Sequence, residues 1–217
     1  MFRGIRLILP VLALGLVSAG SSPAAWADAA SGQTAALSSP KATIENLDNA
    51  LIATMKAGKA AGYQGRYKII APVVEKTFDF QRIGELALGS DWGKLNADQQ
   101  KQFVKVLREY TAATYAGRFD GYDGEHFAVV EVQQLRPGTM GVFTTFTTKN
   151  GRVHRFDYLL EQAGGKDWKI INVVADGVSD LSLKRSEYTT MIESKGFPAL
   201  LAHLRKEIQD YASGSSS

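Results

Sequence analysis

The stretch SDWGKLNADQQKQFVKVLREYTAATYAGRF, which runs from Ser90 to Phe119, predicts one long amphipathic helix. Asn96 and Gln99 are placed as in a capping box, the arrangement typical of a helix start. Large apolar side chains then recur at the spacing of one helix face: Phe103, Val106, Leu107 and Tyr110. The stretch contains no catalytic motif, so we expect it to present an apolar surface to the rest of the fold.

The chain before this helix has helical periodicity as well. Apolar residues recur at helical spacing over residues 43–58 and again over residues 67–74, where Pro72 should mark a break or a restart. Asp79 can cap a short third helix that Gly89 would end. The N-terminal half of the chain is therefore predicted to be helical.

After residue 119 the apolar pattern changes. Four segments rich in Val, Ile, Thr, Phe and Tyr predict strands: residues 126–135, 139–149, 152–162 and 167–178. Turn signals separate them: Arg136-Pro137-Gly138, Asn150-Gly151 and Gly164-Gly165. Helices should close the chain at residues 187–194 and 198–211. The predicted fold is α+β, a curved antiparallel sheet of about four strands with N- and C-terminal helices packed on one face.

The N-terminus has the layout of a secretory signal peptide. Arg3 and Arg6 precede an apolar run over residues 7–17, and Ala25-Trp26-Ala27 is an A-x-A cleavage site. The apolar run is about half of the roughly 20 residues that a spanning helix needs. We expect a signal peptide at 1–27, a flexible lead-in at 28–40, one domain at 41–211 and a disordered tail at 212–217; an uncleaved N-terminal anchor is the alternative.

Composition excludes several functions. The chain has no cysteine, which excludes disulfides, thiol catalysis and thiolate metal sites. The formal charge is +3, and loss of the two arginines of the leader would reduce it to about +1, so electrostatic capture of nucleic acid is not expected.

Candidate catalytic and metal-binding residues are few. His126, His154 and His203 have no partners at ligand spacing, so we predict structural or surface roles and no metal site or cofactor. The segment DGYDGE, residues 120–125, resembles a calcium loop only loosely and is better explained as a turn.

Asp157 and Asp176 are the best remaining acid or base candidates. Asp157 alternates with apolar neighbours, which places it on the opposite face of its strand. Asp176-Gly177 resembles a strand-ending turn. Catalysis at either carboxylate is therefore the weaker hypothesis.

The helix and the strands offer much apolar surface. The side chains that should face one another across them are Phe103, Leu107, Tyr110, Tyr115, Phe119, Val142, Phe146, Phe156, Tyr158 and Leu160. Periodicity alone is compatible with an ordinary filled core. If helix and sheet do not close completely, the same residues line an apolar cavity.

Specific motifs relate the chain to a known family: Phe78-Asp79-Phe80, Leu-Gly-x-x-Trp ending at Trp92, Gln-Gln-x-x-Phe ending at Phe103, Asp157-Tyr158, Trp168-Lys169, and Asp176-Gly177-Val178-Ser179 leading to Arg185-Ser186. With these motifs nearly all of the mature chain resembles the MlaC family of periplasmic lipid carriers, the toluene-tolerance proteins. Residues 110–127 look most like the hopanoid-associated branch, HpnM, although MlaC-type proteins usually carry Glu-Gly where this chain has Asp176-Gly177.

The resemblance implies a soluble periplasmic carrier that holds phospholipid or hopanoid in an internal apolar pocket. It also implies an inner-membrane lipid transporter and an outer-membrane donor or acceptor complex as partners. Lys149, Arg152 and Arg155 are candidate docking residues, with a solvated basic edge as the alternative. A periplasmic enzyme acting on an apolar substrate and a ligand-free scaffold stay open as other functions.

Overall fold

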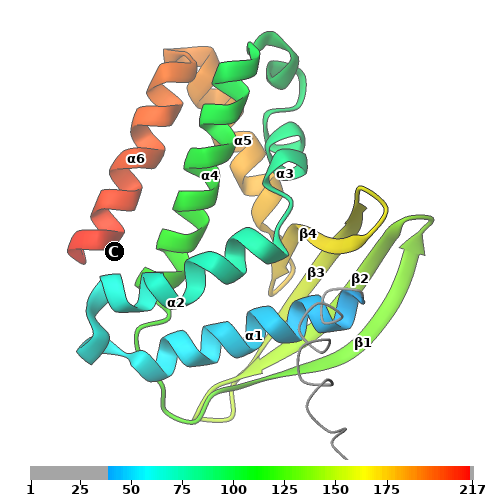
Figure 1. Ribbon diagram of the computed structural model, residues 1–217, viewed down its shortest axis with the longest axis vertical. Coiled ribbons are helices and arrows are strands. Elements are labelled where there is room, and N and C mark those ends of the chain that lie inside the picture. The colour runs from blue at the N-terminus through cyan, green and yellow to red at the C-terminus, as the bar shows by residue number, and fades with distance from the viewer. Residues whose placement is uncertain (1–38, 216–217) are drawn as a thin grey trace, which may run out of the picture. The chain divides into compact units, whose positions relative to one another are not determined.

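The computed structural model describes residues 39–215. Within this range the elements follow in the order α1 (Pro40–Ala57), α2 (Gly62–Thr77), α3 (Phe80–Leu88), α4 (Ala97–Arg118), β1 (His126–Arg136), β2 (Thr139–Thr147), β3 (Val153–Ala163), β4 (Asp167–Ala175), β5 (Val178–Ser179), α5 (Asp180–Lys195) and α6 (Phe197–Ser213) (Figure 1). Short 3-10 turns at Lys59–Ala61 and Gly89–Lys94 join α1 to α2 and α3 to α4. The predicted α+β class is confirmed.

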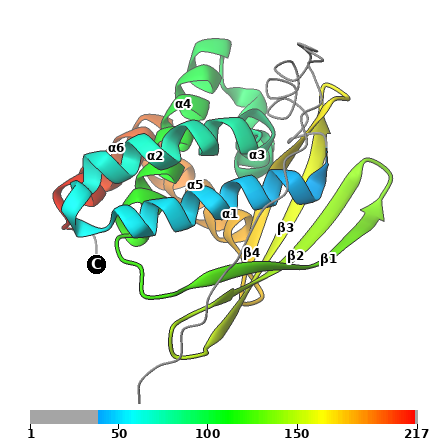
Figure 2. The same cartoon turned by 60° about the horizontal axis from the view of Figure 1, so that its bottom comes forward.

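The sheet is an antiparallel meander in which each strand pairs with the next, in the order β1 to β5. About four strands were expected, and a fifth strand of two residues follows the turn at Asp176-Gly177. Register shifts interrupt β1 between Val129 and Glu131 and the β3–β4 pairing at Leu159 and Leu160. Such bulges bend and twist strands, which agrees with the curved sheet in Figure 2.

The helices cover one face of the sheet. Helix α1 runs across the sheet close to β1, β2 and β4, while α2 and α3 approach β4 (Figures 1 and 2). Tyr158 and Leu160 of β3 are buried in one core with Ile44 and Leu47 of α1. Asp157 alternates with Tyr158 and therefore points to the opposite face, as predicted.

Helix α4 begins with the predicted capping box. Asn96 Oδ1 accepts hydrogen bonds from the backbone N–H groups of Asp98 (3.1 Å) and Gln99 (2.9 Å). Gln99 Oε1 in turn accepts the N–H of Asn96 at 2.9 Å. The main backbone neighbours of α4 are α2, α3 and α6 rather than a strand. Side chains alone therefore span the space between α4 and the sheet.

Two contacts hold the C-terminal end of α4 against other helices. The buried Arg66 of α2 donates to the carbonyl of Ala116 (2.7 Å) and to that of Gly58 (2.9 Å). On another side, a Cβ added at Gly117 would come within 2.5 Å of the Tyr211 ring of α6. Glycine at this position permits the close approach of α4 and α6.

The predicted break at Pro72 is wrong, because α2 is continuous through this residue. Proline removes one hydrogen bond to the carbonyl four residues earlier, which belongs to Lys68. Both Lys68 and Pro72 are exposed, so water can satisfy that carbonyl.

The start of α5 also differs from the prediction. The helix begins at Asp180 rather than at residue 187, and the Ser179 hydroxyl caps it by accepting the N–H of Ser182 at 3.2 Å. The first turns of α5 are mostly polar and exposed. Apolar residues at helical spacing, the pattern that predicts a helix, are therefore largely missing from them.

Both ends of the described range are helical. Ser39 caps α1 and Pro40 opens it, so the last two residues of the expected lead-in belong to a helix start. Helix α6 continues to Ser213, past the expected start of the tail. The predicted signal peptide at 1–27 and most of the lead-in lie outside the described residues. Among those described, no helix has the length and apolar character required to cross a membrane.

Candidate ligand-binding cavity

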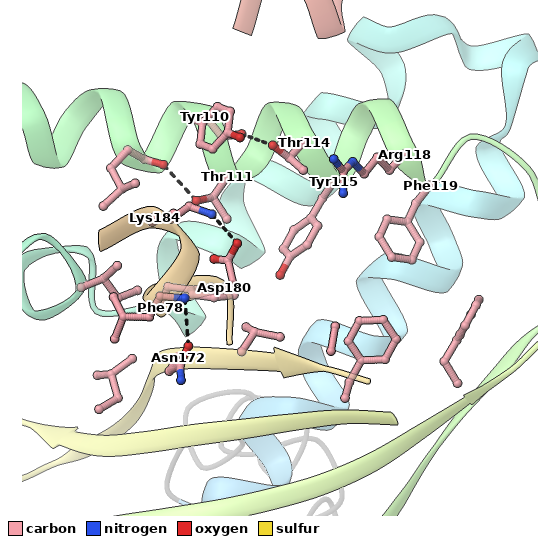
Figure 3. Close-up of a pocket in the computed structure, with 18 of the residues that line it drawn as sticks. Phe78, Tyr110, Thr111, Thr114, Tyr115, Arg118, Phe119, Asn172, Asp180 and Lys184 are labelled. Carbon is pink, nitrogen blue, oxygen red and sulfur yellow. Dashed lines mark hydrogen bonds and ion pairs between the residues drawn. The ribbon is translucent and has the colours of Figure 1, made fainter. Parts of the chain in front are cut away.

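A cavity of about 480 Å³ lies between α4, the start of α5 and strands β2 to β4 (Figure 3). This volume falls within the roughly 300–1,000 Å³ that is typical of small-molecule sites. Aromatic and aliphatic side chains make up most of its wall, and three charged side chains line it as well.

The structure brings six of the ten predicted pocket residues together in the cavity wall: Leu107, Tyr110, Tyr115, Phe119, Phe146 and Phe156. The other four lie in close-packed core. Phe103 stacks edge-on against Tyr188, with ring centroids 5.9 Å apart, at the contact of α4 with α5. Val142, Tyr158 and Leu160 are buried in the core shared with α1. Ligand binding by any of the ten stays a prediction.

The remaining lining residues were not predicted from the sequence: Met55, Phe78, Ile83, Thr111, Thr114, Arg118, Ile171, Asn172, Val173, Ala175, Asp180, Leu181 and Lys184. Three of these, Asp180, Leu181 and Lys184, belong to the part of α5 that precedes the predicted helix at residues 187–194. Phe78 belongs to the Phe-Asp-Phe motif of the family, and nothing in that motif indicates a place in a pocket wall.

Aromatic rings form a continuous row along the cavity. Phe78 and Tyr115 have ring centroids 6.3 Å apart, and Tyr115 lies 5.9 Å from Phe119. Phe119 contacts Phe146 at 6.4 Å, and Phe146 contacts Phe156 at 6.3 Å, both edge to face. Edge-to-face pairs are favourable and hold ring orientations. The row gives the cavity an aromatic wall of defined shape.

Polar groups are gathered along the α4 and α5 side (Figure 3). Lys184 forms an ion pair with Asp180, and its ammonium lies 5.4 Å from the centroid of the Tyr110 ring. The side chain of Lys184 is only 15% exposed. The hydroxyls of Thr111 and Thr114 donate to carbonyls of their own helix. These threonines are satisfied without a ligand.

Helix α1 carries a buried carboxyl group that does not line the cavity. Asp48 of α1 is 6% exposed, and its Oδ1 atom has no hydrogen-bond partner. Burial, helped by the charge of Glu45, raises the pKa of Asp48 to about 7. Burial also raises the pKa of the Tyr115 and Tyr158 phenols, and the charge of Asp48 adds to both shifts.

Neither candidate catalytic carboxylate lines the cavity. Asp157 lies near Arg155, with Nη2–Oδ2 at 3.3 Å, on the far face of β3. Asp176, in a turn with φ of 48°, bonds His154 Nδ1 (2.7 Å) and the N–H of Arg155 (2.8 Å). The hydrogen bond from His154 lowers the pKa of Asp176. Between residues 39 and 215 no group of three or more His, Asp or Glu side chains could hold a metal ion.

The candidate docking residues lie at and beside the β2–β3 turn. Lys149 pairs with Asp123 at 2.9 Å, and Arg155 contacts Asp157. Arg152 forms no ion pair with any described residue. Phe146, which precedes this turn on β2, lines the cavity. The C-terminal end of β2 therefore links the turn directly to the cavity wall.

The geometry defines an α+β domain with an apolar cavity between its long helix and its sheet. Residues 45–206 match the family model described as MlaC protein. This range covers well over half of the chain, and the chain belongs to the MlaC family. The predicted resemblance is confirmed at this level, while the hopanoid-associated branch stays a prediction.

Two relatives support the assignment. The toluene tolerance protein ttg2D of Pseudomonas putida is 22% identical over 170 residues, covering 75% of this chain and 77% of that protein. A phospholipid-binding protein from Ralstonia solanacearum, solved in complex with a phospholipid, matches with a TM-score of 0.68 and 20% identity. The match covers 79% of this chain and 97% of that one. The second relative shows a shared fold.

We predict that Asp48→Asn makes the protein less sensitive to alkaline pH. The native carboxyl holds its proton up to about pH 7, whereas the ordinary pKa of an aspartate is 3.8. Between about pH 4 and pH 7 the native state binds more protons than the unfolded state. The free energy of unfolding of the wild type therefore falls as the pH rises through this range. The amide stays neutral, and the variant should be more stable at about pH 8 by on the order of 2–4 kcal/mol.

Urea unfolding at several pH values measures this difference. The matched control is Asp98→Asn, which changes the same group on an exposed helix start. Parallel pH profiles for wild type and Asp48→Asn would mean that Asp48 is ionised in the native protein.

Proposed function

We propose that this chain is a periplasmic lipid carrier that binds the apolar part of a phospholipid or hopanoid between α4 and the sheet. The observation that carries the proposal is the cavity itself, whose wall is largely aromatic and aliphatic and includes neither candidate catalytic carboxylate. An apolar ligand needs such a wall rather than a nucleophile. Family membership and the phospholipid-bound relative of the same fold support the same function.

A physical barrier explains why such a carrier is needed. A diacyl lipid has roughly thirty chain methylenes, and their transfer into water costs about 24 kcal/mol at about 0.8 kcal/mol each. As an activation barrier this cost allows escape from a bilayer at only about 10⁻⁵ per second. A protein cavity that replaces the bilayer around the chains removes most of the cost. Transfer between the inner and outer membranes is the step proposed for this chain.

Two ligand classes are candidates for the cavity. The acyl chains of a phospholipid are flexible and can follow an irregular apolar space. The fused rings of a hopanoid are rigid, lose little conformational entropy on binding and demand a matching surface. The aromatic row from Phe78 through Tyr115 and Phe119 to Phe156 is the observation that favours the second class.

The proposed site can be filled by a single substitution. Val173 and Val174 are consecutive on β4, so their side chains point to opposite faces of the sheet. Only Val173 lines the cavity. We predict that Val173→Trp lowers the amount of co-purifying lipid at least about tenfold. If the larger side chain excludes as few as two methylenes of the lipid, the binding free energy falls by about 1.6 kcal/mol.

Val174→Trp is the matched control and should retain its lipid. Organic extraction with mass spectrometry measures the lipid, and circular dichroism with a thermal melt measures the fold. If folded Val173→Trp keeps its full lipid content, the lipid lies elsewhere. If wild type yields no lipid at all, the ligand-free scaffold becomes the better function.

Release of an apolar ligand is uphill, so a docking partner must favour an opened or emptied state. We propose the inner-membrane transporter and the outer-membrane complex as the partners, and the β2–β3 turn as a docking element. The turn carries Arg152, which has no ion pair within the described part of the chain, and lies next to the cavity-lining Phe146.

Charge reversal at this turn tests the docking role. We predict that the double variant Lys149→Glu, Arg152→Glu slows lipid transfer to acceptor membranes that contain the partner. The two glutamates would be repelled by an acidic partner surface that attracts the native basic side chains. Its lipid content should equal that of wild type. The control Lys105→Glu changes an exposed residue of α4, and equal transfer by all three proteins would remove the turn from the mechanism.

A further inference from the structure

Arg118 is a cation at the cavity wall, and no described carboxylate pairs with it. It lies at the last position of α4, beside Tyr115 and Phe119, and is one of three charged residues that line the cavity (Figure 3). The other two, Asp180 and Lys184, form an ion pair with each other. No ion pair of Arg118 occurs among residues 39–215.

The charges that line the cavity are therefore unbalanced. Two cations and one carboxylate leave a formal charge of +1. Lys184 is held in place by Asp180 and by the Tyr110 ring, and its side chain is largely buried. Arg118 is exposed and free to turn toward a ligand. A ligand that carries one negative charge outside its apolar body would neutralise this wall.

A purely structural role for Arg118 is also available. A cation in the last turn of a helix interacts favourably with the helix dipole. That role needs the charge but not the cavity, and it affects stability rather than ligand choice. Binding and stability measurements can therefore separate the two roles.

We propose that Arg118 is a specificity-determining residue that contacts the phosphodiester of a bound lipid, so that the cavity prefers phosphate-bearing lipids over uncharged ones. The inference rests on the proposed lipid-carrier function. A planar guanidinium can donate two parallel hydrogen bonds to phosphate oxygens, which a lysine cannot reproduce. The acyl chains of such a lipid would contact the aromatic wall, and its phosphate would contact Arg118 at the end of α4.

The test offers the purified full chain vesicles that contain equal amounts of phosphatidylglycerol and diacylglycerol with identical acyl chains. Wild type should extract phosphatidylglycerol in about fivefold excess, a modest value because Arg118 is exposed to solvent. Arg118→Gln should bring the ratio close to one without reducing total lipid per protein. Arg118→Lys keeps the charge but cannot donate two parallel hydrogen bonds to one phosphate, so it should give an intermediate ratio of phosphatidylglycerol to diacylglycerol.

Lys105→Gln is the matched control for net charge. It removes one cation from the same helix, thirteen residues away or about 20 Å along the axis, and does not line the cavity. Its lipid ratio should equal that of wild type. If Lys105→Gln lowers the ratio as much as Arg118→Gln, overall attraction to the anionic vesicle explains the preference and the proposal is overturned.

Other outcomes also decide the matter. A wild-type ratio of one, or an unchanged ratio in Arg118→Gln with a lowered melting temperature, would leave Arg118 with only its helix-end role. Inorganic phosphate alone should not stabilise the wild-type protein; stabilisation that depends on Arg118 would indicate a free-phosphate site instead of a lipid site. Uptake of neither lipid by wild type would contradict the carrier function itself.

Discussion

The C-terminal half of α4 is held by other helices and not by the sheet, and the cavity depends on this arrangement. Arg66 bonds the carbonyl of Ala116, and Gly117 lets the Tyr211 ring of α6 approach closely. These contacts place α4 above the strands at a distance that its own side chains do not fill. A filled core would have needed larger residues on β4, where Val173 and Ala175 line the space instead.

The cavity divides into two kinds of surface with different physical tasks. Aromatic rings from the α2–α3 junction, α4, its C-cap, β2 and β3 provide an apolar wall, where binding is driven by removing hydrocarbon from water. Charged and hydroxyl groups lie along α4 and α5, where a polar part of a ligand can stay hydrated. Asp48 belongs to neither surface. It is a buried carboxyl whose Oδ1 has no hydrogen-bond partner among residues 39–215, and its burial costs less when it keeps its proton.

Much of the fold could be predicted from local patterns. Capping by Asn96 and Gln99, the turn at Asn150-Gly151 and the alternation around Asp157 each have a local cause and were confirmed. The start of α5 was missed because its first turns are polar, and Pro72 was misread because solvent can satisfy an open carbonyl. The cavity residues were harder to predict. Phe103 and Phe119 belong to the same amphipathic pattern, yet only their tertiary neighbours decide which one packs in the core and which one lines the cavity.

We propose that the space between α4 and the sheet holds a lipid. Native mass spectrometry of the wild-type protein, purified without detergent from cells that make phospholipids and hopanoids, tests it most directly. The expected result is a folded protein whose native mass exceeds its own mass after denaturation by that of a bound lipid, an excess that disappears in Val173→Trp but not in Val174→Trp. A lipid-free mass for the wild-type protein, or an identical excess in both variants, would contradict it.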